Sequence, residues 1–299
     1  MPGKRLIAIV GPTASGKTTL AIKLAKKFDG EIVSADSRQI YRGMDIGTAK
    51  PTINERQAVP HHLIDIRDPG DDYTVADYQC DAIAAINDII ARGKVPFLVG
   101  GTGLYVRAVV ENLNIPKIIA NPKLRAEIEN EIAQNGLEAV FKKLIVLDPE
   151  AANVVDPKNP RRVVRALEVA LTTGEPFTAQ RTKNTPLFDT LMLGLDSPAE
   201  ALRERINRRV DDMVSNGLID EVRMLIKKYG ATAPALNAIG YREVIDHLNG
   251  ALSLEDAAAV IKMNTWHYAK RQTTWFKKYQ PTHWIDSEHA ASMLIEHFL

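Results

Sequence analysis

Hydrophobic and polar positions in the first hundred residues follow a pattern that predicts strands and helices in turn. Short apolar runs predict strands over Arg5–Val10, Glu31–Ala35, His62–Ile66 and Val95–Val99. Helical spacing predicts helices over Lys17–Phe28 and from Thr74 to about Ala91, and Asp77 stands three residues after Thr74 as in a capping box. This alternation predicts an α/β fold, with a parallel sheet covered by helices on both faces.

The alternation of strands and helices stops near Pro116. From there to about Pro186 the pattern is helical, without a convincing strand, and the expected helices are Lys123–Gln134, Leu137–Leu144 and Arg161–Thr173. Farther along, the pattern predicts a strand at Leu191–Leu195, a helix that begins near Pro198, a long helix over Leu254–Tyr279 and a last strand at His283–Ile285. We therefore expect a discontinuous core domain, residues 1–115 and 188–299, with an all-helical insertion domain, residues 116–187.

Composition and charge exclude several classes of protein. The 299 residues are 45% hydrophobic and 25% charged, as in ordinary globular chains, and the net charge of +1 excludes a uniformly basic nucleic-acid binder. The single cysteine, Cys80, excludes an intramolecular disulfide and Cys₄ or Cys₂His₂ zinc sites, and its apolar neighbours predict a buried side chain. His61 and His62 have no partners at ligand spacing, so we expect a structural role. No run of 18 apolar residues and no signal-peptide pattern occurs, so we expect no membrane span and a cytoplasmic protein.

One motif, between the first predicted strand and the first predicted helix, indicates phosphate binding. It reads Gly11-Pro12-Thr13-Ala14-Ser15-Gly16-Lys17-Thr18 and matches GxxxxGK[ST], the P-loop. The glycines let backbone N–H groups turn toward phosphate oxygens, the helix N-terminus adds positive potential, Lys17 adds a full charge, and the Thr18 hydroxyl can bind Mg²⁺. The motif predicts a di- or triphosphate ligand in a P-loop-type fold, but it does not identify the molecule that carries the phosphates.

The acidic residue that P-loop hydrolases use is missing from its usual place. Such proteins hold Mg²⁺ with a carboxylate at the end of a second strand, whereas Val95–Val99 is followed by Gly100-Gly101-Thr102-Gly103. Asp36 does follow a strand. Because residues just past the carboxyl ends of parallel strands line the ligand crevice, we expect Thr18, Asp36 and Thr102 to meet at one site. The alternative is that Asp36 caps a turn or helix and that Thr102 is a simple turn residue.

Three short segments concentrate positive charge. They are Lys158–Arg165, Arg203–Arg209 and Lys270–Lys278. Arg161 and Arg165 are four residues apart, as are Arg205 and Arg209, so each pair lies on one helix face. Such faces are typical of contacts to a diphosphate or to a nucleic-acid backbone, and the alternative is a solvated face with ordinary ion pairs.

Eight motifs, in one order along the chain, resemble those of a single family. They are GPTASGKT (Gly11–Thr18), ADSRQIY (Ala35–Tyr41), GTAKP (Gly47–Pro51), HHLID (His61–Asp65), GGTGLY (Gly100–Tyr105), NPRRVVRALEV (Asn159–Val169), IGYRE (Ile239–Glu243) and AKRQTTWF (Ala269–Phe276). Over essentially its whole length the chain resembles the bacterial tRNA dimethylallyltransferases, the isopentenyl-tRNA transferase family. Many folds share the P-loop, but the joint set of motifs is highly specific.

The resemblance implies a reaction and its partners. The family transfers a dimethylallyl group from dimethylallyl diphosphate to the exocyclic N6 of the adenosine immediately 3′ of the tRNA anticodon. The P-loop would then hold the diphosphate of a prenyl donor, with Mg²⁺ on Thr18. It would replace the DDxxD signature of other prenyltransferases, which neither Asp71-Asp72 nor Asp211-Asp212 begins. The family also suggests a monomer whose helical insertion clamps the anticodon stem-loop.

The resemblance further implies roles for single residues. Asp36 would take the proton from N6, Thr102 would touch the donor phosphate near the reacting carbon, and Lys17 would stabilise the leaving diphosphate. An arginine would assist Lys17, either Arg209 or, as the alternative, Arg205. The flipped base would contact Asp36, Ser37, Arg38 and Gln39. The tRNA would contact Arg161, Arg162, Val163, Val164 and Arg165, although some family members carry glutamine where Arg161 stands.

Two other functions stay open from the residues alone. An adenylate dimethylallyltransferase, which acts on free AMP, ADP or ATP, would share Lys17, Thr18 and Asp36, but it would not need an insertion with clustered arginines. A P-loop NTPase or RNA-binding regulator without transfer chemistry would be expected to carry a carboxylate after Val95–Val99, and the sequence has none there.

Overall fold

The chain divides into two compact units. The computed structural model describes residues 3–115, 121–180, 182–279 and 281–299. One unit, called the core unit here, consists of Met1–Val110 and Pro186–Leu299, and the other, called the insertion, is Glu111–Thr185. The sequence placed the start of the insertion at residue 116, which lies outside the described residues.

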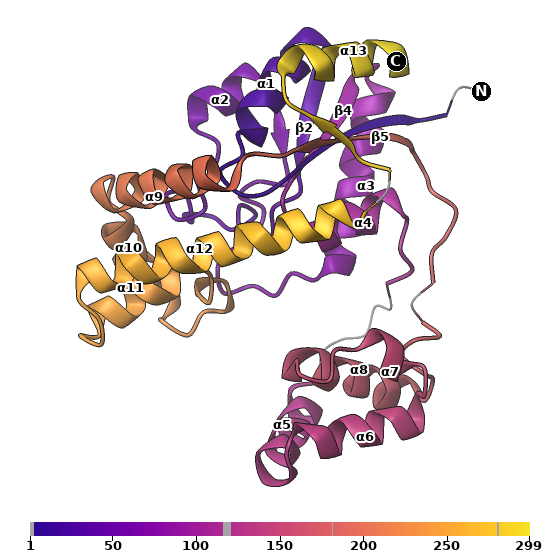
Figure 1. Ribbon diagram of the computed structural model, residues 1–299, viewed down its shortest axis with the longest axis vertical. Coiled ribbons are helices and arrows are strands. Elements are labelled where there is room, and N and C mark those ends of the chain that lie inside the picture. The colour runs from indigo at the N-terminus through magenta and orange to yellow at the C-terminus, as the bar shows by residue number, and fades with distance from the viewer. Residues whose placement is uncertain (1–2, 116–120, 181, 280) are drawn as a thin grey trace. The chain divides into compact units, whose positions relative to one another are not determined.

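A parallel sheet forms the centre of the core unit (Figure 1). The described strands lie in the order β3-β2-β4-β1-β5-β6, and every neighbouring pair is parallel. Their bounds are β1 Arg5–Val10, β2 Gly30–Ser34, β3 His61–His62, β4 Val95–Gly100, β5 Asp189–Leu195 and β6 His283–Ile285. Because β2, β4 and β1 are adjacent and parallel, the loops that follow them start at the same edge of the sheet.

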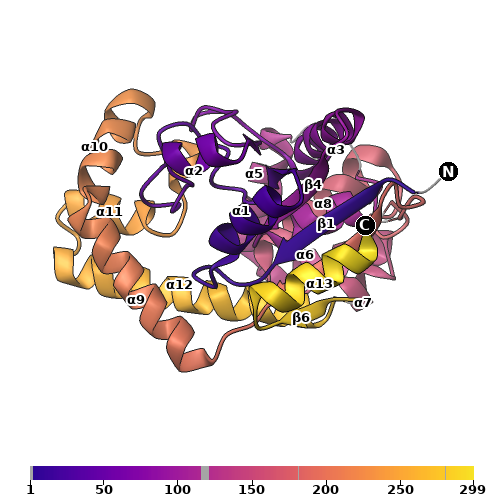
Figure 2. The same cartoon turned by 90° about the horizontal axis from the view of Figure 1, so that it is seen from above.

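Helices cover both faces of the sheet, as the sequence predicted. They are α1 Lys17–Lys27 and α13 Glu288–Phe298 on one face, and α3 Val75–Ala91 and α4 Gly103–Val110 on the other. Figure 2 shows α1 and α13 side by side. Ile7 and Ile9 of β1 face these two helices, whereas Leu6 and Ala8 face α3 and α4. Successive strand residues point to opposite faces, so a strand buried on both sides is a continuous apolar run.

A group of helices packs beside the sheet in the same unit. They are α2 Ile53–Ala58, α9 Ala199–Ser215, α10 Leu218–Tyr229, α11 Tyr241–Leu248 and α12 Leu254–Lys277. Ile40, Tyr41 and Met44, from the loop after β2, are buried in the hydrophobic core that α9, α10, α11 and α12 share. The long yellow helix in Figure 1, α12, packs against α9, α11 and α4. Helices far along the chain therefore hold the loop that begins with Asp36.

The described part of the insertion is mainly helical, as predicted, and its two ends meet in an isolated antiparallel bridge between Leu113 and Lys183. Its helices are α5 Pro122–Asn135, α6 Leu137–Leu147, α7 Ala151–Val154 and α8 Pro160–Thr173. Asn121 and Asn159 each stand before a proline at the first helical position, and each side chain accepts the backbone N–H three residues on. Ile128, Val140 and Leu167 belong to a hydrophobic core of the insertion's own. The insertion is thus built as a separate packing unit.

Two local predictions are wrong. The strand expected over His62–Ile66 ends at His62, because Leu63 and Asp65 have φ values of 62° and 57°, a left-handed conformation that turns the chain away from the sheet. Cys80 is exposed, since it lies on the side of α3 opposite to the buried Ala82. The apolar neighbours that suggested burial face the sheet from the other side of the helix.

Candidate functional site

The motif after β1 forms one wall of a cavity at the carboxyl edge of the sheet. Gly16 precedes α1 with a φ of 90°, and Ala14 also has a positive φ, 61°. A Cβ on Gly11 would lie 2.7 Å from the carbonyl oxygen of Leu195, so only glycine lets the loop leave β1 this close to β5. The cavity has a volume of about 130 Å³ and is lined by Thr13, Ala14, Gly16, Lys17, Thr18, Thr19, Asp36, Gln39, Thr48, Ala49, Val99, Gly100, Gly101, Arg209, Tyr268 and Gln272.

The ammonium of Lys17 lies under the loop. Its Nζ donates to the carbonyl oxygen of Pro12 at 2.5 Å and lies 3.5 Å from Ser15 Oγ. Burial lowers the pKa of Lys17 from 10.5 to about 7, the negative charge of Asp36 opposes this shift, and the positive charge of Arg209 adds to it. An anion in the cavity would favour the protonated form, so the site is suited to a negatively charged ligand.

The two arginines of α9 reach the loop in different ways. Arg209 is half-buried and lines the cavity, and its Nη1 donates to Thr13 Oγ1 at 3.3 Å. Burial lowers the pKa of Arg209, and the charge of Arg205 adds to the effect. Arg205 is exposed, and its Nε donates to the carbonyl oxygen of Ala14 at 3.0 Å. Arg209 therefore points at a ligand in the cavity, whereas Arg205 holds the loop from outside.

Asp36 caps a turn and also faces the cavity. Its Oδ1 accepts the backbone N–H of Arg38 at 2.8 Å and that of Gln39 at 3.4 Å. Its charge acts on both Lys17 and Arg209 across the cavity. One carboxylate oxygen of Asp36 thus caps the turn, which is the alternative role that the sequence left open for this residue. Its other oxygen, Oδ2, has no hydrogen bond to any described residue, so it can accept one from a ligand.

Thr102 lies just behind the lining residues. Its backbone N–H donates to the carbonyl oxygen of Ala35 at 3.1 Å, and its Oγ1 accepts the backbone N–H of Ser37 at 3.1 Å. Tyr268 of α12 lines the cavity and shares a hydrogen bond with the Thr102 side chain, while burial raises the pKa of the phenol to about 12. Thr102 therefore connects the loop after β4 to the turn that follows Asp36.

Gln39 connects the same turn to the opposite wall of the cavity. Its Nε2 lies 3.4 Å from the carbonyl oxygens of both Thr48 and Ala49. The guanidinium of Arg38 points elsewhere, with Nη1 3.4 Å from the carbonyl oxygen of Ala235. The segment Ser37–Gln39 thus contributes Gln39 to the cavity surface.

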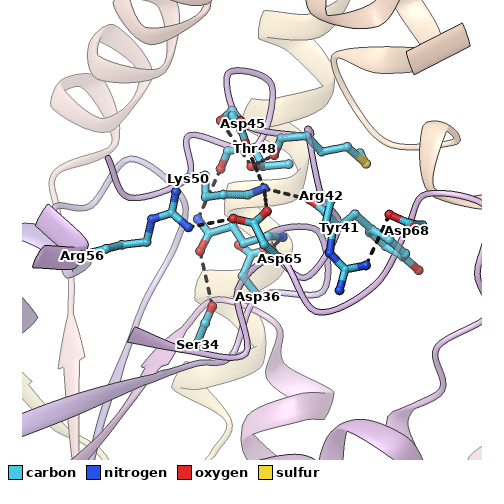
Figure 3. Close-up of polar contacts among 12 residues, drawn as sticks. Ser34, Asp36, Tyr41, Arg42, Asp45, Thr48, Lys50, Arg56, Asp65 and Asp68 are labelled. Carbon is cyan, nitrogen blue, oxygen red and sulfur yellow. Dashed lines mark hydrogen bonds and ion pairs between the residues drawn. The ribbon is translucent and has the colours of Figure 1, made fainter. Parts of the chain in front are cut away.

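Beyond Ala49, a buried ammonium fixes the loop (Figure 3). The Lys50 side chain is 1% exposed, and its Nζ donates to the Tyr41 carbonyl oxygen at 2.7 Å and to Oδ1 of Asp45 and of Asp65, both at 2.6 Å. Arg56 donates to Asp65 Oδ2 at 2.7 Å. Burial alone would raise the pKa of Asp65, but the hydrogen bonds from Lys50 and Arg56 outweigh it and keep the pKa below its ordinary value. The motifs GTAKP and HHLID meet in this ion network.

A buried carboxylate anchors the same loop from α10. Glu221 accepts the backbone N–H groups of Asp45, Ile46 and Gly47 at 3.0, 2.7 and 3.2 Å, and the Tyr241 hydroxyl at 2.6 Å. A Cβ on Gly47 would lie 2.5 Å from the Tyr241 ring, so the loop can pack here only with glycine. Tyr241 belongs to the motif IGYRE. It therefore supports the cavity wall through Glu221 and not by lining the cavity.

We expect Glu221→Gln to lower the free energy of unfolding of the core unit by about 2–4 kcal/mol, because an amide cannot accept all of these buried donors and introduces donors of its own. Asp220→Asn is the control, since Asp220 is an exposed neighbour that pairs with Arg223 at 2.9 Å. It should change the stability by less than about 0.5 kcal/mol. Denaturant unfolding monitored by fluorescence measures both. Equal stabilities of the two variants would contradict an anchoring role.

The arginine-rich segment of α8 is divided between surface and core. Arg161 and Arg162 are exposed, and the two valines that follow are buried in the hydrophobic core of the insertion. Arg165 is half-buried and donates to Glu168 at 2.7 Å, together with Arg125. Burial would raise the pKa of Glu168, but the hydrogen bonds from the two arginines keep it low. Only the first two arginines are thus directed to solvent.

Sequence reasoning did not single out five polar or small residues of the cavity, of which Thr19 directly follows the P-loop motif. Thr48 and Ala49 belong to the motif GTAKP, and Gln272 belongs to AKRQTTWF, so the motifs themselves were the available signal. Tyr268 stands four residues before Gln272, which places both on one face of α12. Helical spacing from the motif could have found it.

Comparison with known proteins gives consistent matches over most of the chain. A family described as IPP transferase matches residues 39–279. A tRNA dimethylallyltransferase of Thermomicrobium roseum is 49% identical over 284 residues, which is 95% of this chain and 86% of that protein. The crystal structure of a tRNA isopentenylpyrophosphate transferase from Bacillus halodurans is 45% identical with a TM-score of 0.73, covering 99% of this chain and 95% of that one. A eukaryotic dimethylallyltransferase acting on tRNA is 32% identical with a TM-score of 0.76, over 91% of this chain and 70% of its own.

Proposed function

Since the chain belongs to the IPP transferase family, we propose that it transfers a dimethylallyl group from dimethylallyl diphosphate to N6 of the adenosine immediately 3′ of the tRNA anticodon and releases diphosphate. One observation carries the proposal for this site. The cavity has Lys17 and Arg209 at one wall and a carboxylate, Asp36, facing both. Cations for a leaving diphosphate and a proton acceptor for an amine thus line the same small space.

The P-loop would bind the diphosphate leaving group. As the bond between C1 of the allyl group and the diphosphate oxygen breaks, the bonding electron pair moves to the diphosphate. Lys17, Arg209 and the N–H groups at the start of α1 would stabilise that charge, and the N6 lone pair would form the new bond to C1. The contacts of Lys17 with Pro12 and of Arg209 with Thr13 hold both cations in position before the reaction. They can therefore stabilise the developing charge without moving first.

The residues present fit a magnesium ion that arrives with the diphosphate. Thr18 lines the cavity at the start of α1, and its hydroxyl would hold Mg²⁺. In the described part of the chain, no group of three or more His, Cys, Asp or Glu side chains could hold a metal ion by itself. One hydroxyl suffices, because Mg²⁺ in such sites is bound mainly by substrate oxygens and water. When bound, Mg²⁺ would neutralise part of the charge on the departing diphosphate.

Asp36 would receive the proton that N6 loses. The adenine amine is a weak nucleophile because its lone pair is conjugated with the ring, so a hydrogen bond from N6 to a carboxylate raises its reactivity. The Asp36 oxygen that the turn does not use is available for this bond, while the hydrogen bonds of its other oxygen keep the side chain oriented. Thr102, held by Ser37 and Tyr268, would stand near the reacting carbon.

The tRNA would bring its adenosine to the cavity by flipping the base out of the anticodon loop. The exposed guanidinium groups of Arg161 and Arg162 on α8 would contact the phosphate backbone of the anticodon arm.

In the part of the chain that the structure describes, no helix has the length and apolar character to cross a membrane. We place the activity in the cytoplasm, where tRNA is modified, and propose that the protein acts as a monomer.

Arg162→Ala is expected to raise the KM for tRNA several-fold and to reduce the slope of log KM against log salt by about 1, because one phosphate contact is lost. The KM for dimethylallyl diphosphate should not change, since Arg162 belongs to the insertion, whereas all residues that line the cavity belong to the core unit. Lys142→Ala is the control: it removes one positive charge from the same unit, at an exposed lysine of α6 that pairs with Glu138. Equal changes in both variants would show an effect of net charge instead of a contact.

Nucleoside mass analysis tests the function directly. Unmodified tRNA is incubated with the protein, Mg²⁺ and dimethylallyl diphosphate, digested, and searched for N6-dimethylallyladenosine next to the anticodon. A parallel reaction with AMP distinguishes an adenylate dimethylallyltransferase, and a phosphate-release assay with ATP or GTP distinguishes a P-loop hydrolase. Modified tRNA with neither of the other products is the expected result. Nucleotide hydrolysis without prenylated RNA would contradict the proposal.

A further inference from the structure

One face of α12 shapes the loop that follows β4. Gln272 and Trp275 lie on this face, three residues apart. A Cβ on Gly101 would be 2.2 Å from Gln272 Nε2, and a Cβ on Gly103 would be 2.2 Å from Trp275 Nε1. Any side chain at Gly101 or Gly103 would therefore displace Gln272 or Trp275 of α12 from its present position.

Gln272 also reaches the P-loop. Its side chain is buried, with the residue 6% exposed. Its Oε1 accepts the backbone N–H of Thr13 at 2.8 Å, and its Nε2 donates to the carbonyl oxygen of Gly101 at 2.9 Å. Because one partner is only a donor and the other only an acceptor, a single orientation of the amide satisfies both. Gln272 is therefore a bridge between the two loops that bound the cavity.

Each end of this bridge is next to a group that the reaction uses. On the P-loop side, the hydroxyl of Thr13 accepts a hydrogen bond from Arg209 at 3.3 Å. On the other side, Gly101 precedes Thr102, which Tyr268 of the same helix also contacts. The length of one glutamine side chain thus sets the distance between the diphosphate wall and the wall that carries Thr102.

We propose that Gln272 is a positioning residue, which fixes the separation of the P-loop and the loop after β4 for the transfer reaction. The inference rests on the proposed function. Both polar ends of the side chain are bonded within the protein, so we assign its effect to Thr13 and Gly101. A displacement of reacting groups by about 1 Å can cost a factor of about 10² in rate, so a loosened bridge is expected to affect turnover most.

The first test is Gln272→Met, which keeps the length of the side chain and removes both hydrogen bonds. We expect kcat for tRNA prenylation to fall by about 10- to 100-fold, with an unchanged KM for tRNA. Thr273→Val is the control on the same helix, because the Thr273 hydroxyl donates to the carbonyl oxygen of Ala269 at 3.1 Å and neither residue lines the cavity. It should keep wild-type kcat.

Gln272→Glu adds a readout that loss of packing does not produce. A carboxylate can accept from Thr13 but cannot donate to Gly101, whereas the protonated carboxylic acid can do both. The kcat of Gln272→Glu, divided by that of the wild type at the same pH, should therefore rise as the pH falls from 8 to 6. The same ratio for Gln272→Met should stay flat.

The outcomes separate this inference from the proposed function. If the wild type does not prenylate tRNA, the proposed function fails. If it does, and Gln272→Met keeps wild-type kcat, the bridge has no positioning role. The inference also fails if the kcat loss of Gln272→Met comes with an equal rise in the KM for tRNA, or if the Gln272→Glu ratio does not change with pH.

Discussion

Asparagine in place of Asp36 is expected to lower kcat for tRNA prenylation by a factor of about 10²–10⁴, the range that a positioned general base contributes. The substitution keeps the shape of the side chain. Its amide oxygen can still accept the hydrogen bonds that Asp36 takes from the N–H groups of Arg38 and Gln39, so the turn should persist. Only the proton acceptor is lost. Single-turnover rates at saturating dimethylallyl diphosphate and tRNA measure the effect.

Alanine at position 36 is the matched comparison, because it removes the acceptor and the cap together. A lost cap of this kind costs about 1 kcal/mol, so Asp36→Ala should be less stable than Asp36→Asn. We expect the two variants to lose similar amounts of turnover. A near wild-type kcat for Asp36→Asn would mean that Asp36 acts by shaping the turn, and the assignment as base would be wrong.

The elements that could be predicted from the sequence are those whose signals are local. The apolar run of β1 followed by the P-loop glycines indicated a strand, a turn and a helix, and the structure has each of them. The capping box of Thr74 and Asp77 indicated where α3 begins, and both of its hydrogen bonds are present. Such signals depend on neighbours within a few residues, so one sequence is enough to read them.

The contacts that complete the cavity depend on residues far apart in the chain. Gln272 binds Thr13 across 259 positions, and Glu221 binds the loop at Asp45 across 176. No local pattern encodes such pairs. The motifs that contain Thr13 and Gln272 marked those two segments as unusual, but Glu221 and Asp45 lie in none of the motifs. The same limit explains the error at His62–Ile66, where an apolar pattern resembled a strand. There the ion pair of Asp65 with Lys50 requires a turn instead.

Methionine in place of Lys17 is expected to lower kcat by about 10²–10³, the effect of removing one group that stabilises developing negative charge. The side chain keeps its length and apolar stem, so the cavity should retain its shape. Lys23→Met is the control on the same helix, because Lys23 is exposed and pairs with Glu288 at 2.9 Å. It should leave kcat unchanged. A Lys17→Met variant that matches this control would show that the ammonium does not assist departure of the diphosphate.

The half-buried ammonium of Lys17 should also make diphosphate binding depend on pH. With a pKa of about 7 in the folded protein against 10.5 as its ordinary value, Lys17 is largely neutral at pH 8. Between these two pKa values the unfolded chain binds more protons than the folded protein. The stability of the unliganded protein therefore rises with pH across this window, and Lys17→Met should lack that rise.

Inorganic diphosphate favours the charged ammonium of Lys17, so the affinity of the protein for diphosphate should fall as the pH increases above 7. Titration calorimetry at pH 8, in two buffers of different ionisation enthalpy, should show uptake of about one proton more by the wild type than by Lys17→Met. Equal uptake by both proteins would mean that Lys17 is already charged before the diphosphate binds.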